Sequence, residues 1–326
     1  MGDAPPASRQ LGLDLGGTNI KWVVAEHGAG VAGEWQILDR GQVATPVAEG
    51  PDAVVSALTS VGAAAIGRSP GVTSVGVGVP GLYDPIAGTT RFLVNFPGGW
   101  PGVPIAGPVG AALGLPVALI NDARAFGLAE LRLGAARGAS SMVGLTLGTG
   151  IGGVFAVDAR VHQGHDGTGG ELGHQTLDPE GPPCGCGNRG CLEAFARADR
   201  IAAACGTATA ESAFMAARAG DPAAVAGLAL VGRYLGIGIA NMVVVVNPDV
   251  VVIGGGISAA FDLLRDPIEA ELRQRVHTTA LELVRVVPAE LGTWAGAIGA
   301  AIHGAEAAET AGRQDPAVAR GSVVAR

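Results

Sequence analysis

Three glycine-rich turns, each directly after a short apolar segment, constrain the fold of this chain most strongly. The segments and their turns are Leu11–Leu15 with Gly16, Gly17 and Thr18, Met142–Leu147 with Gly148–Gly153, and Asp249–Ile253 with Gly254–Gly256. Short apolar segments that end in glycine predict buried strands. The turns expose consecutive backbone N–H groups, which form concave nests for phosphate oxygens. A single such turn is more often a plain hairpin, but three together favour a nucleotide site.

The residues around the first turn suit a phosphate bound with its metal ion. Asp14 supplies a carboxylate that can hold Mg²⁺ through water, Thr18 adds a hydroxyl, and Lys21 can neutralise phosphate charge. The chain has neither the G-x-x-x-x-G-K-[ST] motif nor a dinucleotide fingerprint within a βαβ unit. We therefore expect hairpins, rather than one helix N-terminus, to hold the phosphates.

Predicted helices alternate with the strands along the chain. Helical spacing covers 52–66, 105–113, 122–133, 192–204, 210–219, 222–245, 258–276 and the segment from 295, whereas further strands are expected at 20–25, 74–79, 117–120, 151–157 and 283–287, with a polar loop over 158–190. This alternation predicts the α/β class. A chain of 326 residues is long enough for two lobes.

A weak internal repeat supports two related lobes. Leu13-Asp14-Leu15-Gly16 and Leu145-Thr146-Leu147-Gly148 open similar strand–turn–strand units, one in each half of the chain. We expect the lobes to face each other across a nucleotide cleft. The smaller N-terminal lobe would span 1–121 and be completed by the C-terminal helix at about 297–326, and the larger lobe would span 122–296. Fraying is expected from about 306 to the end.

Charge and hydropathy exclude several classes of protein. Lys and Arg number 21 against 29 Asp and Glu, a formal net charge of −8, and no basic cluster stands out, which argues against a nucleic-acid partner. No uninterrupted apolar run reaches the roughly 18–20 residues of a membrane span. The first ten residues lack the apolar core of a secretory signal. We expect a cytoplasmic protein with no membrane partner.

A cysteine cluster predicts a metal site. Cys184, Cys186 and Cys191 lie within eight positions on a glycine-rich segment, and His174 precedes them. Three thiols and one imidazole make a closed tetrahedral zinc site with no open position for water, so the metal would be structural. A pair of structural thiols or a disulfide is the alternative, although a C-x-C disulfide is strained. Zinc would fix the loop that presents Glu171, His174 and Glu193 to a polar ligand. Cys205, in an apolar helix, is expected to be a core residue.

Asp122 is the candidate general base. It follows a predicted strand, where open α/β sheets place their ligands. A kinase that acts on a sugar hydroxyl needs a carboxylate to accept the proton. The alternative is that Asn121 or Asp122 only caps the helix that follows. Both interpretations can hold at once.

These residues resemble the ROK family of the actin-like ATPase superfamily over about residues 11–304. The matching motifs are Asp14–Lys21 (DLGGTNIK), Gly78–Gly81 (GVPG), Asn121-Asp122, Gly148–Gly153 (GTGIGG), Gly170–His174 (GELGH), Cys184–Glu193 (CGCGNRGCLE) and Val252–Gly256 (VIGGG). The cysteine motif with its preceding Glu-x-Gly-His is highly specific, and the glycine turns are moderately so.

The resemblance implies two actin-like, ribonuclease H-like lobes and the transfer of phosphate from ATP with Mg²⁺ to the 6-hydroxyl of a hexose. It implies that Asp122 is the catalytic base and that His174 serves both the zinc ion and the sugar. The implied sugar ligands are Gly81, Asn95, Asn121, Asp122, Glu171, His174 and Glu193. The implied nucleotide-binding residues are Asp14, Gly16, Gly17, Thr18, Asn19, Lys21, Gly148, Thr149, Gly150, Gly152, Gly254, Gly255 and Gly256. Family members are commonly homodimers or homotetramers.

Glucose is the expected substrate, with alternatives in the same class and in other classes. Two departures from the family pattern lie near the sugar residues: Asn95–Trp100 (NFPGGW) is one residue longer than usual, and Asp122 is followed by Ala123-Arg124 where a second Asn is frequent. An N-acylhexosamine kinase, for N-acetylglucosamine or N-acetylmannosamine, is the alternative, and fructose or allose remain open. The rivals from other classes are a sugar-responsive repressor and a non-catalytic sugar-binding regulator. A repressor would need a preceding DNA-binding domain, for which 13 residues before Asp14 leave no room.

Overall fold

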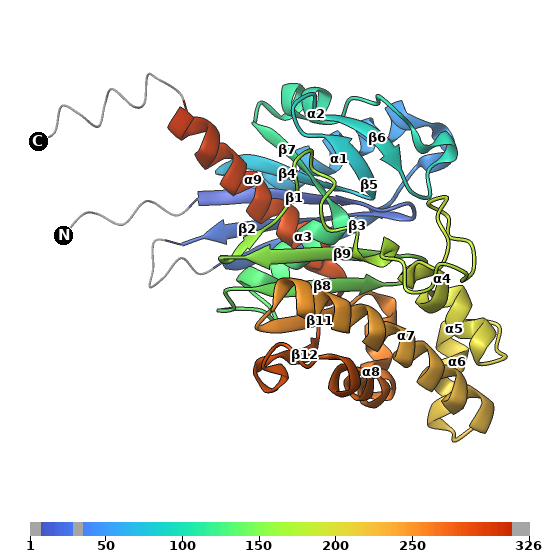
Figure 1. Cartoon of the computed structure of the whole chain (residues 1–326). Helices are drawn as coiled ribbons and strands as arrows, with labels where there is room; N and C mark the ends of the chain where they lie inside the picture. Colours follow the sequence, from blue (N-terminus) through green and yellow to red (C-terminus); the bar gives the residue numbers. More distant parts are fainter. Residues whose placement is uncertain (1–7, 29–34, 315–326) are drawn as a thin grey trace, which may run out of the picture. The chain divides into compact units, whose positions relative to one another are not determined.

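The computed structural model describes residues 8–28 and 35–314 and divides them into two compact units. Unit 1 combines the chain up to Ala129 with the chain from Trp294 onward, and unit 2 is Glu130–Thr293. Each unit contains a five-stranded sheet with helices packed on it (Figure 1). The predicted α/β class is confirmed.

The sheet of unit 1 has the order β3-β2-β1-β4-β7. Its strands are β1 (Ser8–Leu15), β2 (Asn19–His27), β3 (Trp35–Ala44), β4 (Val72–Val79) and β7 (Val117–Asn121), and a separate hairpin is formed by β5 (Gly81–Asp84) and β6 (Thr89–Leu93). Strands β1 and β2 are antiparallel, whereas β1, β4 and β7 run parallel. The helices are α1 (Pro51–Arg68), α2 (Ala106–Leu113), α3 (Asp122–Arg132), which continues into unit 2, and α9 (Ala295–Gln314).

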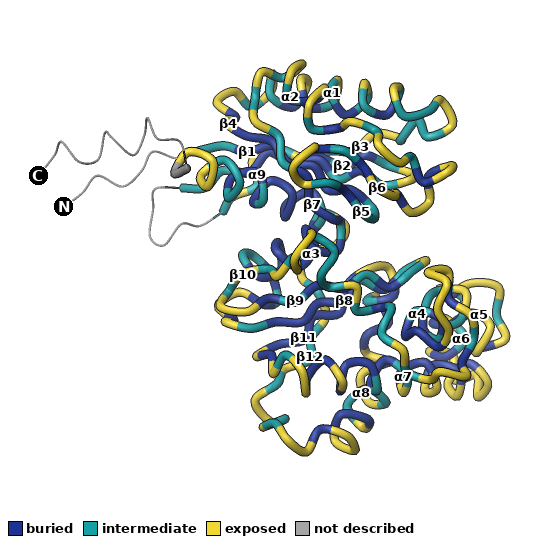
Figure 2. Tube along the Cα trace, turned by 45° about the horizontal axis from the view of Figure 1, so that its top comes forward, coloured by how far each residue is buried: buried dark blue, intermediate teal, exposed yellow. Residues whose placement is uncertain are grey.

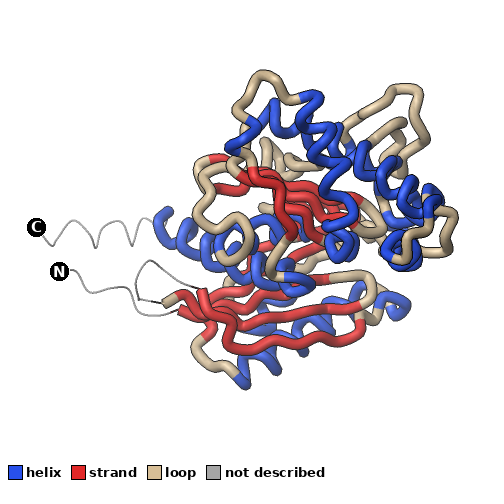
Figure 3. The backbone as a smooth tube through the Cα atoms, turned by 90° about the horizontal axis from the view of Figure 1, so that it is seen from below, coloured by secondary structure: helices blue, strands red, loops and turns tan. Residues whose placement is uncertain are grey.

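Helices α1 and α9 cover opposite faces of this sheet because β1 alternates large and small side chains. The Leu11 side chain faces Gly62 of α1, whereas a Cβ on Gly12 would lie 1.9 Å from the Ala297 carbonyl oxygen of α9. Helix α1 starts with proline at its first position, a favoured place for that residue, and buries Val54 and Leu58 one turn apart. Figure 3 shows helices on both sides of the strands.

The sheet of unit 2 has the order β10-β9-β8-β11-β12. Its strands are β8 (Met142–Leu147), β9 (Ile151–Val157), β10 (Arg160–Val161), β11 (Val250–Gly254) and β12 (Arg285–Pro288). The helices are α4 (Leu192–Ala196), α5 (Ala198–Ala204), α6 (Ala210–Arg218), α7 (Pro222–Val246) and α8 (Phe261–Arg275). Both sheets therefore place an antiparallel hairpin beside parallel strands, which confirms the internal repeat seen in the sequence.

Several elements differ from the sequence-based expectation. Strand β3 and the β5–β6 hairpin were not predicted, because β3 is an edge strand whose residues alternate between partial and full exposure and β5 and β6 are short. The helix expected over 192–204 breaks at Arg197, which is extended because Ala198 donates its N–H to the Gly148 carbonyl. Residues 258–260 form a 3-10 turn before α8.

The predicted lobe boundaries and the end of the chain also differ in detail. Residues 122–129 and 294–296, which the sequence assigns to the larger lobe, lie in unit 1. Helix α9 continues to Gln314, so residues 306–314 are helical where fraying was expected. The rest of the expected C-terminal helix and tail, 315–326, lies outside the described residues. The expected functional lobes stay a prediction.

Helix α7 is the one helix among the described residues that is long and apolar enough to cross a membrane. The sequence shows no uninterrupted apolar run there because Arg233 and Asn241 divide it. Half of its most apolar window is buried in the protein, where Leu228, Val231 and Leu235 belong to the core of unit 2. Figure 2 shows buried segments along α7 and on β8 and β11. A core helix meets the same criterion of length and composition, and we interpret α7 as one.

Candidate functional site

Three parallel strands of unit 1 end at one edge of the sheet, and the predicted residues follow them. Asp14 is the last residue but one of β1, Asn121 ends β7, and Gly81 comes two residues after β4. The carboxyl ends of parallel strands are where open α/β sheets hold ligands. A Cβ on Gly17 would lie 3.6 Å from the Asn95 Cβ, so the loop that carries Asn95 also touches the first glycine turn. The structure therefore gathers these predicted residues of unit 1 at one place.

The first glycine turn is tight at its base and open at its tip. The Gly16 N–H donates to the Asn19 carbonyl at 3.0 Å, and a Cβ on Gly16 would lie 2.9 Å from that oxygen. The hydroxyl of Thr45, just after β3, donates to the Gly16 carbonyl at 2.7 Å. Gly17 and Thr18 are exposed. A turn fixed at its base with an exposed tip is suited to present N–H and hydroxyl groups to a ligand.

Asp14 is enclosed by three elements. It is the direct cross-strand partner of Lys21 on β2. A Cβ on Gly296, in the first turn of α9, would lie 2.7 Å from Asp14 Oδ2, and one on Gly78 of β4 would lie 3.5 Å from Oδ1. Burial raises the pKa of Asp14 to about 6, and the positive charge of Lys21 opposes that rise. This carboxyl group is therefore ready to ionise near neutral pH, as a magnesium ligand must.

Asn121 both caps helix α3 and holds the side chain of Asp122. Its Oδ1 accepts the N–H groups of Ala123 and Arg124 at 3.0 and 3.2 Å, which is N-terminal capping. Its Nδ2 donates to the Gly81 carbonyl at 3.1 Å and to Asp122 Oδ1 at 3.0 Å. Asp122 Oδ1 also accepts the Ala123 N–H at 2.8 Å. Asn121 is 5% exposed, so this arrangement is fixed by its surroundings.

The Asn95–Trp100 loop turns through four residues with positive φ angles. Asn95 and Trp100 have φ angles of 66° and 45°, and the two glycines between them, Gly98 and Gly99, have φ angles of 68° and 71°. Positive φ angles are tolerated best by glycine. The Phe96 and Trp100 rings pack edge to face with centroids 4.7 Å apart. Consecutive glycines let the loop turn back so that these rings meet.

The second and third glycine turns lie next to each other in unit 2. Gly148–Gly153 joins β8 to β9, with the Gly148 N–H donating to the Gly150 carbonyl at 2.9 Å and Thr149 exposed. Gly255 has a φ angle of 82°, and a Cβ there would lie 2.3 Å from the Leu147 carbonyl oxygen. Only glycine fits this position, which brings the Gly254–Gly256 backbone against the start of the second turn.

The predicted metal ligands meet in unit 2. The ligand atoms of His174, Cys184, Cys186 and Cys191 all lie within 4.8 Å of one another. Cys184 Sγ is 3.6 Å from His174 Nδ1, and Cys186 Sγ is 3.8 Å from Cys191 Sγ. A tetrahedral zinc ion with its usual bond lengths requires edges of about 3.6 Å between sulfur and nitrogen and about 3.8 Å between sulfurs. The same sulfur separation is far from the roughly 2 Å of a disulfide, and all four cysteines are free thiols.

Burial and the closeness of the three thiols shift their pKa values. Burial and the two neighbouring thiols raise the pKa of Cys191 to about 12. Burial also raises the pKa of Cys184, whereas the backbone N–H of Asn188 lowers that of Cys186. Packing three thiols this closely gains little without a positive ion between them. The fourth cysteine, Cys205, lies in the core of unit 2, as predicted.

The predicted acidic sugar ligands differ in their surroundings. Glu171 is exposed and precedes the 3-10 turn Leu172–His174. Glu193, the second residue of α4, places Oε2 2.9 Å from the Ile151 N and Oε1 3.6 Å from Cys184 Sγ. Glu193 therefore contacts both the second glycine turn and a metal ligand. The sequence analysis predicted Glu193 only as a sugar ligand and neither of these contacts.

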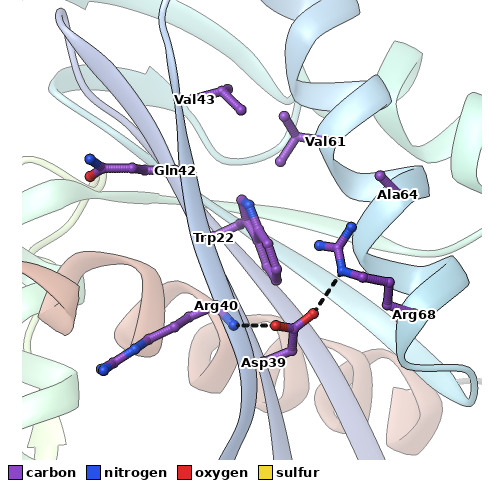
Figure 4. A pocket seen from close by; sticks show the side chains of 9 residues that line it. Trp22, Asp39, Arg40, Gln42, Val43, Val61, Ala64 and Arg68 are labelled. Carbon is purple, nitrogen blue, oxygen red and sulfur yellow. Dashed lines mark hydrogen bonds and ion pairs between the residues drawn. The ribbon is translucent and has the colours of Figure 1, made fainter.

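The open groove of about 380 Å³ on unit 1 contains none of the predicted residues. Trp22, Asp39 and Arg68 line it, between the β2–β3 hairpin and α1 (Figure 4). Arg68 lies over the Trp22 ring and pairs with Asp39 at 3.0 Å. The charges of Arg68 and Asp39 thus compensate each other, and the groove is a surface feature apart from the candidate site.

Gly296 and Ile151 are site residues that the sequence analysis missed. Gly296 leaves room for the Asp14 carboxylate, and Ile151 offers its backbone N–H to Glu193. Gly296 could have been indicated by its position, because it is a glycine in the first turn of a helix, directly after Trp294-Ala295. The second depends on a backbone group, which carries no signal in the sequence.

Comparison with known proteins gives consistent matches over nearly the whole chain. The sequence profile of the ROK family matches residues 10–306. A glucokinase from Thermotoga maritima is 35% identical over 316 residues, which cover 91% of this chain and 97% of that protein.

Two solved structures are similar in fold and sequence. A ROK hexokinase from Thermus thermophilus aligns with a TM-score of 0.79 at 37% identity and covers 93% of this chain and 99% of that one. A ROK family glucokinase from Streptomyces griseus, solved in complex with glucose and AMPPNP, aligns with a TM-score of 0.75 at 30% identity and covers 92% of this chain and all of that one.

Proposed function

The chain belongs to the ROK family, as its motifs predicted, and on that premise we propose that it is an ATP-dependent kinase for the 6-hydroxyl of a hexose, above all glucose. The observation that carries this proposal is the Asp122 carboxylate, which Asn121 holds at the end of β7. A general base must be fixed in orientation before its substrate arrives. The glucokinase and hexokinase relatives support the reaction and the substrate.

The proposed mechanism is an in-line transfer of the γ-phosphoryl group. Asp122 accepts the proton of the sugar hydroxyl as its oxygen attacks phosphorus. Asp14, in its ionised form, holds Mg²⁺ through water, and Lys21 offsets phosphate charge. The backbone N–H groups of the turns 16–18 and 148–153 bind phosphate oxygens, and Gly254–Gly256 lets the backbone approach the adenosine. The remaining sugar contacts come from Gly81, Asn95, Asn121, Glu171, His174 and Glu193.

Zinc is the metal that we propose for the Cys₃His cluster, because its ligand set suits a closed tetrahedral ion and the Cys184–His174 and Cys186–Cys191 separations match the edges of one. His174 would bind it through Nδ1, the nitrogen that faces Cys184, which leaves Nε2 for the sugar. The ion supplies no reaction step. Its role is to hold the loop that carries Glu171 and His174.

The setting of the protein completes the proposal. We propose a cytoplasmic homodimer or homotetramer with no nucleic-acid partner. The acidic net charge of −8 supports the last point, since a nucleic-acid surface would repel it. Three free cysteines held close without a disulfide support a reducing compartment.

The test is an assay that couples ADP release to a colour change, run with ATP and Mg²⁺ across glucose, mannose, fructose, allose, N-acetylglucosamine and N-acetylmannosamine. Glucose should give the highest kcat/KM. A preference for either N-acetylhexosamine would replace glucokinase with the N-acylhexosamine kinase that the sequence leaves open. No ADP release with any of the six sugars, together with measurable glucose binding, would favour a non-catalytic sugar-binding regulator.

A further inference from the structure

The side chain of Glu193 joins two parts of unit 2 that the proposed function treats separately. Its Oε2 accepts the Ile151 N–H at 2.9 Å, within the Gly148–Gly153 turn. Its Oε1 lies 3.6 Å from Cys184 Sγ, one of the four metal ligands. One carboxylate therefore lies between the metal-binding segment, to which Glu193 belongs by sequence, and the second glycine turn, to which it is hydrogen-bonded.

The contact with the glycine turn is close and shaped by the sequence. A Cβ on Gly150 would lie 2.7 Å from Glu193 Oε2, so the absence of a side chain at Gly150 leaves room for the carboxylate in its present position. A charged acceptor on a backbone N–H makes a shorter and stronger hydrogen bond than a neutral one. Ile151 is buried, so water competes little for this N–H group. The carboxylate thereby fixes the direction of the turn at its C-terminal end.

A second contact ties the same segments together at the other end of the turn. Helix α4 starts directly after Cys191, whose carbonyl accepts the Ala194 N–H at 2.9 Å. Beyond the end of α4 and the extended Arg197, Ala198, the first residue of α5, donates its N–H to the Gly148 carbonyl at 2.8 Å. The chain that follows the metal ligands thus contacts the turn at Ile151 through Glu193 of α4 and at Gly148 through Ala198 of α5. Movement of the cysteine segment must therefore be transmitted to the turn.

We propose that Glu193 is a positioning residue for nucleotide binding, which couples the metal site to the Gly148–Gly153 turn. This rests on the proposed function, in which that turn binds the phosphates of ATP. The turn binds phosphate in one conformation. If only a fraction of the molecules hold the turn in that conformation, the observed affinity for the nucleotide falls in proportion to that fraction. Loss of the metal should then weaken nucleotide binding even without sugar.

The test is calorimetric titration of AMPPNP and Mg²⁺ into the protein with no sugar present. Glu193→Ala should raise the Kd about tenfold, the scale of one lost charge-assisted hydrogen bond. Glu193→Gln, which keeps an oxygen for the Ile151 N–H, should recover most of the affinity. Glu180→Gln, at an exposed glutamate of the same segment that has no role in the proposed site, is the matched control and should leave the Kd within twofold. A Glu193→Ala protein with wild-type affinity would overturn the proposal and leave Glu193 a sugar ligand only.

The coupling is tested by repeating the titration on protein stripped of metal. Wild-type protein should lose about tenfold in affinity, and Glu193→Ala should lose little more, because both changes remove the same link. Equal losses on stripping both proteins would refute the coupling. Linkage requires the reverse effect as well: AMPPNP should slow the removal of metal by a chelator. If wild-type protein fails to bind AMPPNP at all, the ATP-dependent function falls too.

Hydrogen exchange gives a measure that does not depend on any ligand. In Glu193→Ala the Ile151 amide should exchange faster than in wild-type protein, whereas amides in the centre of β8 should be unchanged. Unchanged exchange at Ile151 would show that the carboxylate does not hold the turn. The β8 amides also report whether the variant is folded.

Discussion

Asn121 combines the two interpretations that the sequence leaves open at the end of β7. Its Oδ1 caps helix α3 through Ala123 and Arg124, so capping does not depend on Asp122 alone. Both Nδ2 hydrogens have acceptors, on Gly81 and Asp122. The Asp122 carboxylate is therefore oriented by its neighbour. Sequence alone could place both side chains at the strand end but could not divide the roles between them.

Asn121→Ser separates capping from orientation. Serine is as good an N-cap as asparagine, so the unfolding free energy should fall by only about 1–3 kcal/mol, the cost of the lost hydrogen bond to the Gly81 carbonyl. The shorter side chain cannot reach both Gly81 and Asp122, so kcat should fall by about tenfold. Thermal unfolding and steady-state kinetics measure the two effects. A variant with normal kcat would show that Asp122 needs no orientation by Asn121.

The raised pKa of Asp14 predicts an acid limit for activity. If ionised Asp14 holds Mg²⁺, kcat/KM for MgATP should fall about tenfold for each pH unit below about 6. Lys21→Met removes the charge that lowers the pKa of Asp14, so the fall in kcat/KM should begin at a higher pH. Lys21→Arg keeps the charge and should leave the pH of the fall unchanged. A pH–rate profile measures both variants. If kcat/KM of Lys21→Met falls at the same pH as in wild-type protein, ionisation of Asp14 is not the cause of the fall.

The same pKa has a consequence for stability with a definite sign. Asp14 has a folded pKa of about 6 against an ordinary value of 3.8, so the folded state binds the proton more tightly. The ionised group therefore costs stability above about pH 6, and the cost disappears as the pH falls toward 4. Asp14→Asn should accordingly be more stable than wild-type protein at pH 7 in urea titrations without nucleotide, and equally or less stable near pH 4.

At the scale of elements, the packing of α9 on β1 and β4 depends on missing side chains. A Cβ on Gly76 would lie 1.7 Å from the Ala300 carbonyl oxygen. Gly76→Ala should lower the unfolding free energy by about 1–3 kcal/mol or more, as overpacking does. Gly67→Ala on the exposed side of α1, where no atom lies within 4 Å, should raise it by about 1 kcal/mol. Chemical denaturation measures the unfolding free energy of both variants. Changes of the same sign in both would contradict the close packing of α9 on Gly76.

Loss of the metal from the Cys184–Cys191 segment should weaken sugar binding. Cys186→Ser removes one ligand, so bound zinc should be lost and the glucose KM should rise several-fold as the loop with Glu171 and His174 loosens. Cys205→Ala, in the core and outside the cluster, should keep one zinc per chain. Metal analysis and kinetics on both proteins give the answer, and normal glucose KM in zinc-free protein would show that the metal has no role in sugar binding.

Burial decides which strands and helices could be predicted from the sequence. The strands β1, β8 and β11 are largely buried and lead into glycine turns, so their pattern is unambiguous. Strand β3 is an exposed edge strand, so its alternation has no apolar face to indicate it. The break at Arg197 is imposed by a contact with Gly148, 49 residues away, which no local propensity reports.

At the scale of the molecule, the motifs indicated the family and both sheets, and the internal repeat indicated their shared topology. The cluster of metal ligands was predictable because four ligand residues at short spacing have few other uses. The Glu193–Ile151 contact was not, since a backbone N–H 42 residues away leaves no trace in composition or spacing. The sequence thus predicts which side chains lie together, as for the metal-ligand cluster, better than it predicts what each contacts.

The most direct test of the central claim is Asp122→Asn, measured for glucose binding and for ADP release with saturating glucose, ATP and Mg²⁺. Asparagine keeps an oxygen for the Ala123 N–H but cannot accept the hydroxyl proton. Glucose affinity should stay within a few-fold of wild type while kcat falls by roughly 10²–10⁴-fold. A folded Asp122→Asn protein that turns over at the wild-type rate would contradict the account.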